Sequence, residues 1–400
     1  MSERGTRAPV DAHLAPAPSP QPSPHRGEGV STAIGVISGT SMDGIDVALI
    51  ESDGKAELKT GPSATFPYPP EVAQRLRAVV ADLSEAEAPQ LELERLVTDA
   101  HIAAVEAFLE RFSIPRDRVA LVGLHGQTIL HRPRAGLTRQ LCDGARAAAA
   151  LKIDVVSDFR SADVAAGGEG APLAPIYHAA MAAHLERPLM ILNWGGVGNV
   201  TYLGPQGEII AFDTGPANAL IDDFLISRRG LAFDENGALG ASGRIDPTAL
   251  ADLMSDPYFD RPAPKSLDRN HFNAAAACVK RLSDADGAAT LGAFTVESTA
   301  AALKHVPRPP ARWLVGGGGR RNPNLMRRLA ERLHVKVEPV EAIGFDGDSI
   351  EAQCFAYCAL RSRRGLPISF PTTTGAPKPM SGGVFWPTNM KRAPLARGPS

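Results

Sequence analysis

The chain has 400 residues, a formal net charge of −2 and a sequence pI near 6.6, so nothing points to nucleic acid or an anionic membrane as its main partner. That length is enough for two domains with substantial cores. No apolar stretch reaches the roughly 18 residues of a membrane span, and four cysteines are too few for a disulfide framework, which favours a reducing cytoplasm.

The two ends of the chain differ in composition from the rest. Prolines alternate with Ala, Ser and Gln between Pro16 and Pro24, and residues 1–31 show no apolar period. Such a segment cannot bury a core, and it lacks the apolar region of a secretory signal, so we predict a disordered extension. We also expect residues 388–400 to form a loose tail.

Two apolar runs, 34–37 and 45–50, flank a turn that reads Ser-Gly-Thr-Ser-Met-Asp-Gly over residues 38–44. This pattern predicts a strand, a tight turn and a returning strand. Small side chains and clustered backbone N–H groups in such a turn can cradle a phosphate, although an ordinary hairpin carries about equal weight. The missing Gly-Lys-Ser/Thr excludes a P-loop.

The middle of the chain alternates between helical and extended patterns. Residues 70–112 place apolar side chains at helical spacing, and a short strand at 121–124 leads into His-Gly-Gln-Thr at 125–128. A second hairpin pattern follows at 189–203, with its own glycine-rich turn. Two similar hairpins indicate duplicated lobes in an α/β fold.

Asp213 is the candidate catalytic base. It ends the strand predicted over 207–212, and the turn Thr-Gly-Pro at 214–216 leads from it into a helix that begins near Asn218. A carboxylate at such a strand end can project into a cleft. A helix-capping aspartate is the alternative of equal weight.

A third glycine cluster ends the strand predicted over 313–315 and is followed by Asn322 and Pro323, a helix cap and first-turn proline. Glycines here let the backbone approach a flat ligand such as adenine. Their spacing does not match a dinucleotide fingerprint, which disfavours a Rossmann domain. Glu351 opens the last predicted helix, where it could contact a sugar or a water, or simply complement the helix dipole.

In this order the motifs resemble those of the anhydro-N-acetylmuramic acid kinase family, over about nine-tenths of the chain. A single motif of this kind is weak, but the ordered set is specific. The matching segments are Ser-Gly-Thr-Ser-Met-Asp-Gly-Ile-Asp (38–46), His-Gly-Gln-Thr (125–128), Gly-Gly-Glu-Gly-Ala-Pro (167–172), Asn-Trp-Gly-Gly (193–196), Asp-Thr-Gly-Pro (213–216), Pro-Lys-Ser (264–266), Val-Gly-Gly-Gly (315–318), Asn-Pro (322–323) and Gly-Asp-Ser-Ile-Glu-Ala (347–352).

The resemblance implies the actin-like ATPase and sugar kinase fold, with two lobes of mixed sheet around a nucleotide cleft. We expect lobe I at 32–157 plus 371–387 and lobe II at 158–370. It also implies ATP with magnesium as cofactors, and phosphorylation of 1,6-anhydro-N-acetylmuramic acid with hydrolytic opening of the anhydro ring, in murein recycling. It leaves a homodimer open.

The resemblance also assigns site residues. Asp213 and Glu351 are the catalytic carboxylates. The superfamily often carries a metal-binding aspartate on the first strand, where this chain has only Ser38, so we expect Asp43 to hold magnesium through water. A simple turn aspartate is the alternative of nearly equal weight. The residues expected to bind ATP are Gly39, Thr40, Ser41, Met42, Asp43, Gly44, Ile45, Asp46, Gly195, Gly196, Asn199, Gly316, Gly317, Gly318 and Asn322. Those expected to bind the sugar are His125, Gln127, Arg160, Asp163, Glu169 and Lys265. The muramic carboxylate requires a cation, for which Arg160, Lys265 and Arg269 are the options, and each could equally form a solvated ion pair.

Glu169 departs from the family pattern, in which glutamine is usual, and adds a negative charge near the expected sugar site. A kinase for another amino sugar therefore stays open. A nucleotide-driven binding module with the same two lobes is a further alternative, which the cleft aspartates disfavour.

Overall fold

The computed structural model describes residues 29–39, 42 and 44–388. The predicted disordered extension and loose tail lie almost entirely outside the described residues. So do three residues expected at the ATP site, Thr40, Ser41 and Asp43.

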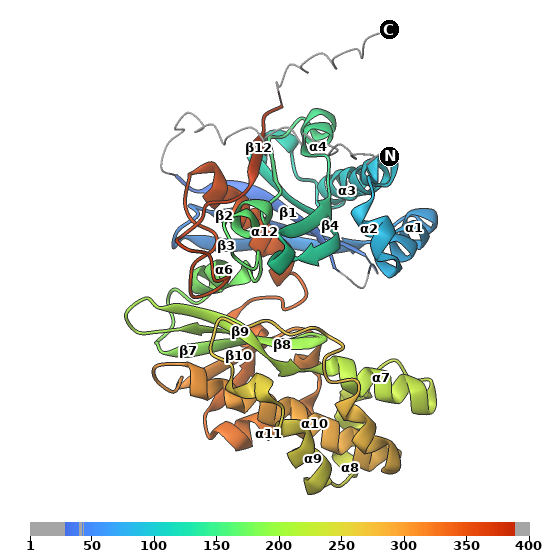
Figure 1. Ribbon diagram of the computed structural model, residues 1–400. Coiled ribbons are helices and arrows are strands. Elements are labelled where there is room, and N and C mark those ends of the chain that lie inside the picture. Colours follow the sequence, from blue (N-terminus) through green and yellow to red (C-terminus); the bar gives the residue numbers. More distant parts are fainter. Residues whose placement is uncertain (1–28, 40–41, 43, 389–400) are drawn as a thin grey trace, which may run out of the picture.

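Two β-sheets organise the chain, one in each lobe (Figure 1). The first has seven strands in the order β12-β6-β4-β1-β2-β3, with β5 paired to β4; the second has five in the order β11-β10-β7-β8-β9. The strands of the first sheet are β1 (Ser31–Ser38), β2 (Ile45–Ser52), β3 (Leu58–Phe66), β4 (Leu121–Arg132), β5 (Leu137–Leu141), β6 (Val155–Ser157) and β12 (Val384–Trp386). Those of the second are β7 (Leu189–Trp194), β8 (Val197–Leu203), β9 (Ile209–Pro216), β10 (Arg312–Gly316) and β11 (Lys336–Pro339).

The two sheets share one topology. In each, three consecutive strands pair antiparallel (β1-β2-β3 and β7-β8-β9), and the next strand of the chain pairs parallel to the first of the three (β4 with β1, β10 with β7). A further parallel strand extends each sheet. Parallel pairing requires a crossover connection, and helices supply it in both lobes. The expected two-lobed α/β fold with duplicated mixed sheets is confirmed.

Helices cover the outer side of each sheet. The first lobe buries a core between its sheet and the helices α1, α3 and α4, and the second lobe buries another beneath α7, α9, α10 and α11. The helices are α1 (Pro70–Ala81), α2 (Leu83–Glu87), α3 (Leu91–Arg111), α4 (Gly144–Leu151), α5 (Ser161–Ala165), α6 (Ala174–Met181), α7 (Asn218–Arg229), α8 (Ala238–Ser242), α9 (Pro247–Met254), α10 (Asp284–Ala300), α11 (Pro323–Leu333) and α12 (Ile350–Arg363). In the described part of the chain, none of these is long and apolar enough to cross a bilayer.

The last helix, α12, packs directly on the first sheet, against β1, β2 and β4. A Cβ on Gly35 would collide with the backbone of Ala352, and one on Gly123 with that of Phe355, so these glycines allow an unusually close contact. The expected second lobe of 158–370 includes α12, and the structure shows this helix packed on the first sheet. Two glycines on strands of the first sheet, far from α12 in the sequence, therefore determine where this helix packs.

The third core lies between the sheets. It joins Ile37 and Leu121 of the first sheet to Ile191 and Leu314 of the second through side chains of α6 and α12. These two helices therefore form a shared layer, and α12 brings its first turn to the boundary of the lobes (Figure 1).

Candidate active site

The first hairpin turn, residues 39–44, connects β1 to β2. The backbone N–H of Met42 donates to the carbonyl of Gly39 at 3.1 Å, and Met42 has a left-handed φ of 55°. A Cβ on Gly44 would collide with the methyl group of Thr65, whose hydroxyl donates to Asp46 Oδ1 at 2.6 Å. Position 44 therefore accepts no larger residue without movement of Thr65.

A buried polar cluster that the sequence analysis missed lies at the end of β1. Tyr68 donates its hydroxyl hydrogen to Ser38 Oγ at 2.7 Å, and His101 Nε2 lies 3.2 Å from Ser38 Oγ and 3.1 Å from the Tyr68 oxygen. Burial lowers the pKa of His101 to about 3, so its imidazole is neutral. The cluster fixes the last residue before the first hairpin turn without adding charge beneath it.

Gln127 holds the start of the same turn. Its amide nitrogen donates to the carbonyl of Gly39 at 3.3 Å and to that of Thr128 at 3.2 Å. The side chain is fully buried, and its Oε1 has no hydrogen-bond partner among the described residues. The expected sugar contact Gln127 is thus placed under the first hairpin turn.

The second hairpin turn, Gly195–Gly196, is tied to the start of α7. The backbone N–H groups of Ala217 and Asn218 donate to the carbonyls of Gly196 and Gly195, both at 3.0 Å. The Asn218 side chain also donates to the carbonyl of Trp194 at 2.9 Å. The sequence analysis used Asn218 only as a helix start, and nothing in its spacing signalled this second role.

Asp213 lies on β9 beside the second hairpin, paired in register with Asn199 of β8. Its Oδ2 accepts a hydrogen bond from the backbone N–H of Leu267 at 2.8 Å, and its own N–H donates to the carbonyl of Lys265 at 2.9 Å. Burial raises the pKa of Asp213 to about 6, and the hydrogen bond from Leu267 opposes that shift. A carboxylate with this pKa is ionised near neutral pH and can still accept a proton.

The capping alternative for Asp213 does not match the geometry. The residue before α7 is Ala217, and no side chain caps that helix. Asp213 instead forms its hydrogen bonds with a neighbouring segment, and its backbone carbonyl accepts a hydrogen bond from the Tyr258 hydroxyl at 2.6 Å. The carboxylate is therefore held in place by contacts unrelated to the helix end.

The glycine loop, residues 316–319, follows β10 and lies against the end of β7. Gly317 has a φ of 71°, and a Cβ there would collide with Asn193 and Trp194. This close approach places the glycine loop next to the second hairpin turn. Asn322 accepts from the backbone N–H of Leu325 at 3.0 Å, so it caps α11 as its sequence context predicts.

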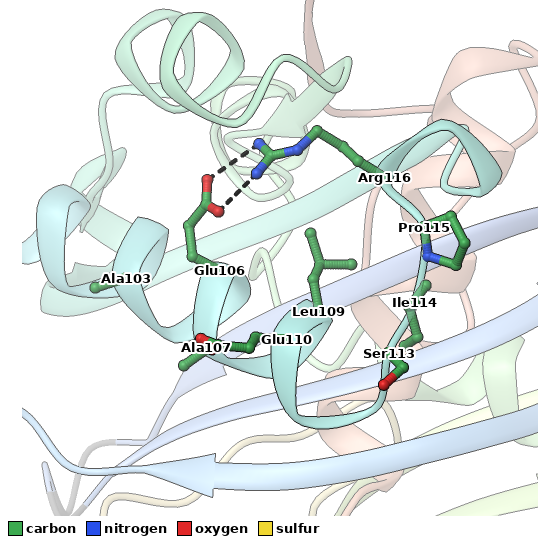
Figure 2. A pocket seen from close by; sticks show the side chains of 9 residues that line it. All are labelled: Ala103, Glu106, Ala107, Leu109, Glu110, Ser113, Ile114, Pro115 and Arg116. Carbon is green, nitrogen blue, oxygen red and sulfur yellow. Dashed lines mark hydrogen bonds and ion pairs between the residues drawn. The ribbon is translucent and has the colours of Figure 1, made fainter.

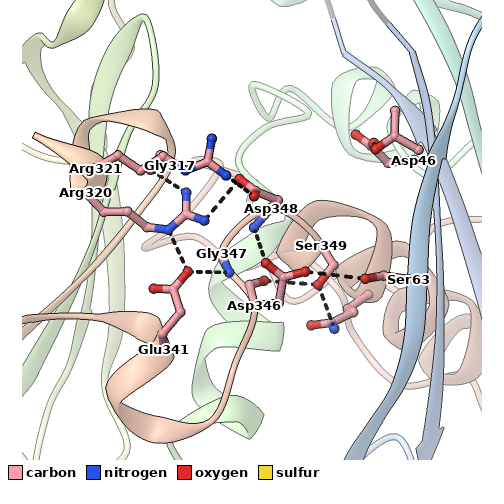
Figure 3. Close-up of polar contacts among 12 residues, drawn as sticks. Asp46, Ser63, Gly317, Arg320, Arg321, Glu341, Asp346, Gly347, Asp348 and Ser349 are labelled. Atoms are coloured by element: carbon pink, nitrogen blue, oxygen red, sulfur yellow. Dashed lines mark hydrogen bonds and ion pairs between the residues drawn. The ribbon is translucent and has the colours of Figure 1, made fainter. Parts of the chain in front are cut away.

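Arg320 connects the glycine loop to the segment that precedes α12 (Figure 3). Its guanidinium donates to the carbonyl of Gly317 at 2.9 Å and forms ion pairs with Glu341 at 2.7 Å and Asp348 at 3.1 Å. The Arg320 side chain is 5% exposed, whereas that of Arg321, which also contacts Asp348, is 66% exposed. In the sequence these two arginines look alike, so their different roles could not be predicted.

Glu351 sits in the first turn of α12 and is reached by water, yet surrounding protein crowds it from several sides. This partial desolvation raises the pKa of Glu351; the charge of Arg160 opposes the shift, and the charge of Asp46 adds to it. The structure thus brings Glu351 into electrostatic contact with both a residue expected at the sugar site and one expected at the ATP site.

Arg160 and His125 form a pair beside α12. Arg160 Nε donates to His125 Nε2 at 2.9 Å, and its Nη1 donates to the carbonyl of Gly170 at 2.9 Å. Burial, with the charge of Arg160, lowers the pKa of His125 well below its usual value, so the ring is a neutral acceptor. The His125 ring packs on Phe355 with centroids 4.3 Å apart. Arg160 is therefore positioned rather than loosely solvated.

Two other expected sugar contacts have structural partners of their own. Asp163 is buried and accepts hydrogen bonds from the Gly170 N–H at 2.7 Å, the Ser369 hydroxyl at 2.5 Å and the Thr374 hydroxyl at 2.7 Å. Both of its oxygens are occupied, so Asp163 holds two loops together. Glu169 donates its backbone N–H to the carbonyl of Thr374 at 2.7 Å, and its side chain stays partly accessible.

Lys265 is not brought together with Arg160 and His125. Its ammonium donates to the carbonyls of Tyr258 at 3.0 Å and Phe259 at 3.4 Å, and it lies 4.5 Å from the centre of the Tyr258 ring. Burial lowers its pKa to about 8. The expected sugar contact Lys265 instead braces the segment that holds Asp213.

A hollow away from the expected site lies at the end of α3 (Figure 2). It measures about 840 Å³ and is lined by residues of 103–116, including the ion pair between Glu106 and Arg116 at 2.6 Å. None of its lining residues belongs to the expected site. Cavity size alone therefore does not locate the chemistry in this protein.

The donor set fits magnesium held mainly by a nucleotide. The described residues contain no cluster of three His, Cys, Asp or Glu side chains suited to a metal. Asp46, directly after the first hairpin turn, and the unpartnered Gln127 Oε1 are oxygen donors near that turn. Mg²⁺ usually keeps several waters and binds one or two protein oxygens together with substrate phosphates, which this sparse set allows. The expected ligand Asp43 lies outside the described residues.

Comparisons with known proteins agree with the family that the sequence motifs resemble. A sequence model of the family described as anhydro-N-acetylmuramic acid kinase matches residues 31–388. A curated relative of that name from Rhodospirillum rubrum is 51% identical over 362 residues, covering 90% of this chain and 95% of its own. Another, from Acidiphilium cryptum, is 52% identical over 356 residues, covering 88% and 97%.

Solved structures are more distant. A ROK family glucokinase from Streptomyces griseus in complex with glucose and AMPPNP aligns over 83% of this chain and 99% of its own, with a TM-score of 0.39 and 14% identity. The ROK hexokinase from Thermus thermophilus aligns over 82% and 98%, with a TM-score of 0.41 and 16% identity. No residue role is transferred from them. From the family match and the close relatives, the chain belongs to the anhydro-N-acetylmuramic acid kinase family.

Proposed function

We propose that this kinase uses ATP to convert 1,6-anhydro-N-acetylmuramic acid to N-acetylmuramic acid 6-phosphate, opening the anhydro ring with water in the same reaction. The observation that carries the proposal is the placement of Asp213. It lies within β9, three residues before the strand ends, beside the second hairpin turn, with a carboxylate oriented by Leu267 and a pKa raised to about 6.

The proposed reaction begins at the anomeric carbon. Asp213 takes a proton from water while the water oxygen bonds to C1 and the bond between C1 and O6 breaks. The freed O6 forms a bond to the γ-phosphorus of ATP, and the bond from that phosphorus to the ADP oxygen breaks. Asp213 later loses its proton to solvent, so the products are the sugar phosphate, ADP and one proton.

We assign the nucleotide to the three glycine elements. The first hairpin turn with Asp46, the second hairpin turn with Asn199, and the glycine loop with Asn322 contain the expected ATP-binding residues. Gly196 and Gly318 are exposed, so they leave backbone uncovered for phosphates and adenine. Magnesium would neutralise phosphate charge, held by Asp46, by Gln127 Oε1 and, through water, by Asp43.

We assign the sugar to the surface around Glu351, His125 and Arg160. A muramic carboxylate requires a cation, and Arg160 is better placed than Lys265, because the Lys265 ammonium is already bound to backbone carbonyls. Glu351, influenced by the charges of both Arg160 and Asp46, is the second carboxylate of the reaction. We place Glu169 at the edge of this proposed sugar site.

A coupled ADP-release assay tests the proposal with three additions: the anhydro sugar, N-acetylmuramic acid and no sugar. ADP release that depends on the anhydro sugar, with one phosphate transferred per ring opened, is the expected result. Preference for another amino sugar would favour the alternative that Glu169 raises. Equal ADP release in all three conditions would contradict sugar phosphorylation altogether.

We further propose that the enzyme acts in the cytoplasm, where its ATP is supplied, and serves murein recycling. The four cysteines are free in the structure, in agreement with a reducing compartment. Deletion of the gene should cause the anhydro sugar to accumulate in growing cells. A homodimer remains a proposal that light scattering of the purified protein decides.

A further inference from the structure

We propose that Arg269 is a catalytic residue that leaves its carboxylate partner and binds the phosphoryl group as it passes from ATP to the sugar. The proposal rests on the ATP placement given above. It adds a contact to the transition state, made by the segment 265–269 that also binds Asp213.

The first observation is the position of the guanidinium. A Cβ built on Gly196 would lie 3.8 Å from Arg269 Nε, so the Arg269 side chain passes directly over the second hairpin turn. Gly196 is exposed, and no side chain of its own separates the arginine from that turn. A phosphate seated on the turn would therefore lie within reach of the guanidinium.

The second observation is the segment that carries Arg269. Its backbone binds Asp213 twice, through the carbonyl of Lys265 at 2.9 Å and the N–H of Leu267 at 2.8 Å. Arg269 follows two residues after Leu267. One short stretch of chain thus fixes the proposed base and places a cation over the neighbouring glycines, which is the arrangement needed where water attack and phosphoryl transfer are coupled.

The third observation is that Arg269 can leave its ion-pair partner at little cost in free energy. Its Nη2 pairs with Asp223 Oδ1 at 3.0 Å, and the two side chains are 54% and 42% exposed. Exposed ion pairs of this kind contribute little to stability. A phosphoryl group offers more charge and a geometry that matches the guanidinium fork, so it competes well against one carboxylate oxygen.

Other cations near the site are more firmly occupied. Lys265 is bound to the carbonyls of Tyr258 and Phe259. Arg320 is 5% exposed and is held by two carboxylates. Of these three cations, Arg269 combines proximity to a glycine turn with one ion pair, to the exposed Asp223, and its charge also acts on the neighbouring Asp222. This combination selects it.

During transfer the bond from the γ-phosphorus to the ADP oxygen breaks while the bond to the sugar oxygen forms. Arg269 donates hydrogen bonds to the equatorial oxygens and exchanges no proton. Because this contact is stronger in the transition state than in bound ADP, it should raise the turnover rate more than nucleotide affinity.

The test compares Arg269→Gln, Arg269→Lys and Asp223→Asn with a matched control, Arg332→Gln. Arg332 also forms an exposed pair, with Glu297 at 2.9 Å, between α10 and α11. We expect Arg269→Gln to lower kcat by about 10²–10³-fold while ADP affinity, measured by calorimetry, changes by less than about 3-fold. Arg269→Lys should recover part of the rate, and added guanidinium ion should partly restore Arg269→Ala. Asp223→Asn and Arg332→Gln should stay within about 3-fold of the parent rate.

Equal losses in Arg269→Gln and Asp223→Asn would show a structural ion pair and overturn the proposal. So would an unchanged kcat in Arg269→Gln, or a loss confined to ADP binding. The variants are assayed with whichever sugar the parent enzyme phosphorylates, so rejection of the anhydro sugar by the parent would count against the proposed substrate and leave this comparison intact. Thermal unfolding of each variant confirms that the fold is retained.

Discussion

Replacing Asp213 by asparagine should separate catalysis from stability, because the two are expected to change in opposite directions. Asparagine keeps the size of the side chain and can still accept the hydrogen bond from Leu267, but it cannot take a proton. Since a positioned base contributes about 10²–10⁴-fold, kcat should fall by at least about 10²-fold while ATP affinity is retained.

The stability effect follows from the pKa of Asp213, which burial raises from 3.8 to about 6. Between these values the folded state binds more protons than the unfolded state, so stability falls as the pH rises from about 3.8 and the loss is complete above about 6. The shift of roughly two pH units corresponds to a cost on the order of 1–3 kcal/mol at pH 7. Asp213→Asn should remove most of this cost and raise the melting temperature at pH 7, with no such gain near pH 4.

The assay is ADP release across pH 5–9, paired with thermal unfolding from pH 4 to pH 9. In the parent enzyme kcat/KM should rise through a midpoint near pH 6, the pKa of Asp213. In Asp213→Asn this rise of activity with pH should be absent. Turnover within a few-fold of the parent would refute the role of Asp213 as base, and Glu351 would then be the carboxylate to examine. A lower melting temperature at pH 7 would refute the electrostatic argument.

Three further substitutions test the rest of the site. Gly44→Val should raise the KM for ATP by at least about 10-fold, because a Cβ there would meet Thr65; an unchanged KM would remove the first hairpin turn from the nucleotide site. Glu351→Gln should raise the sugar KM by about 10-fold, the effect of one lost charged hydrogen bond, with the ATP KM constant; the reverse pattern in steady-state kinetics would place Glu351 at the nucleotide. Arg320→Gln leaves two carboxylates without their buried cation and should lower the melting temperature and weaken ATP binding, whereas Arg321→Gln serves as the exposed control and should match the parent.

Local patterns in the sequence were enough for the two hairpins and for the strand that precedes the glycine loop, but β9 continues through the turn predicted at 214–216. Hairpin turns and strand ends depend on near neighbours, so their chemistry is visible in a few consecutive residues. The motif series also pointed to Glu351 and Arg160, which the structure brings into one electrostatic environment.

What the sequence could not give depends on contacts between distant segments. Lys265 was expected at the sugar, but its environment is set by carbonyls of the chain around Tyr258. The sequence did not show that α12 packs on the first sheet, because this packing depends on Gly35 and Gly123, more than 200 residues earlier. Asp163 looked like a ligand contact until loops from two parts of the chain were seen to occupy both of its oxygens.

The close seating of α12 on Gly35 and Gly123 has a mechanical consequence. It seats α12 on the first sheet, whereas Asp213 belongs to the second sheet. The two carboxylates of the proposed reaction are therefore mounted on different sheets. A short segment joins them, because Arg320 binds Asp348 to the second lobe and the helix begins at Ile350. The complete set of catalytic groups therefore depends on how the two sheets meet.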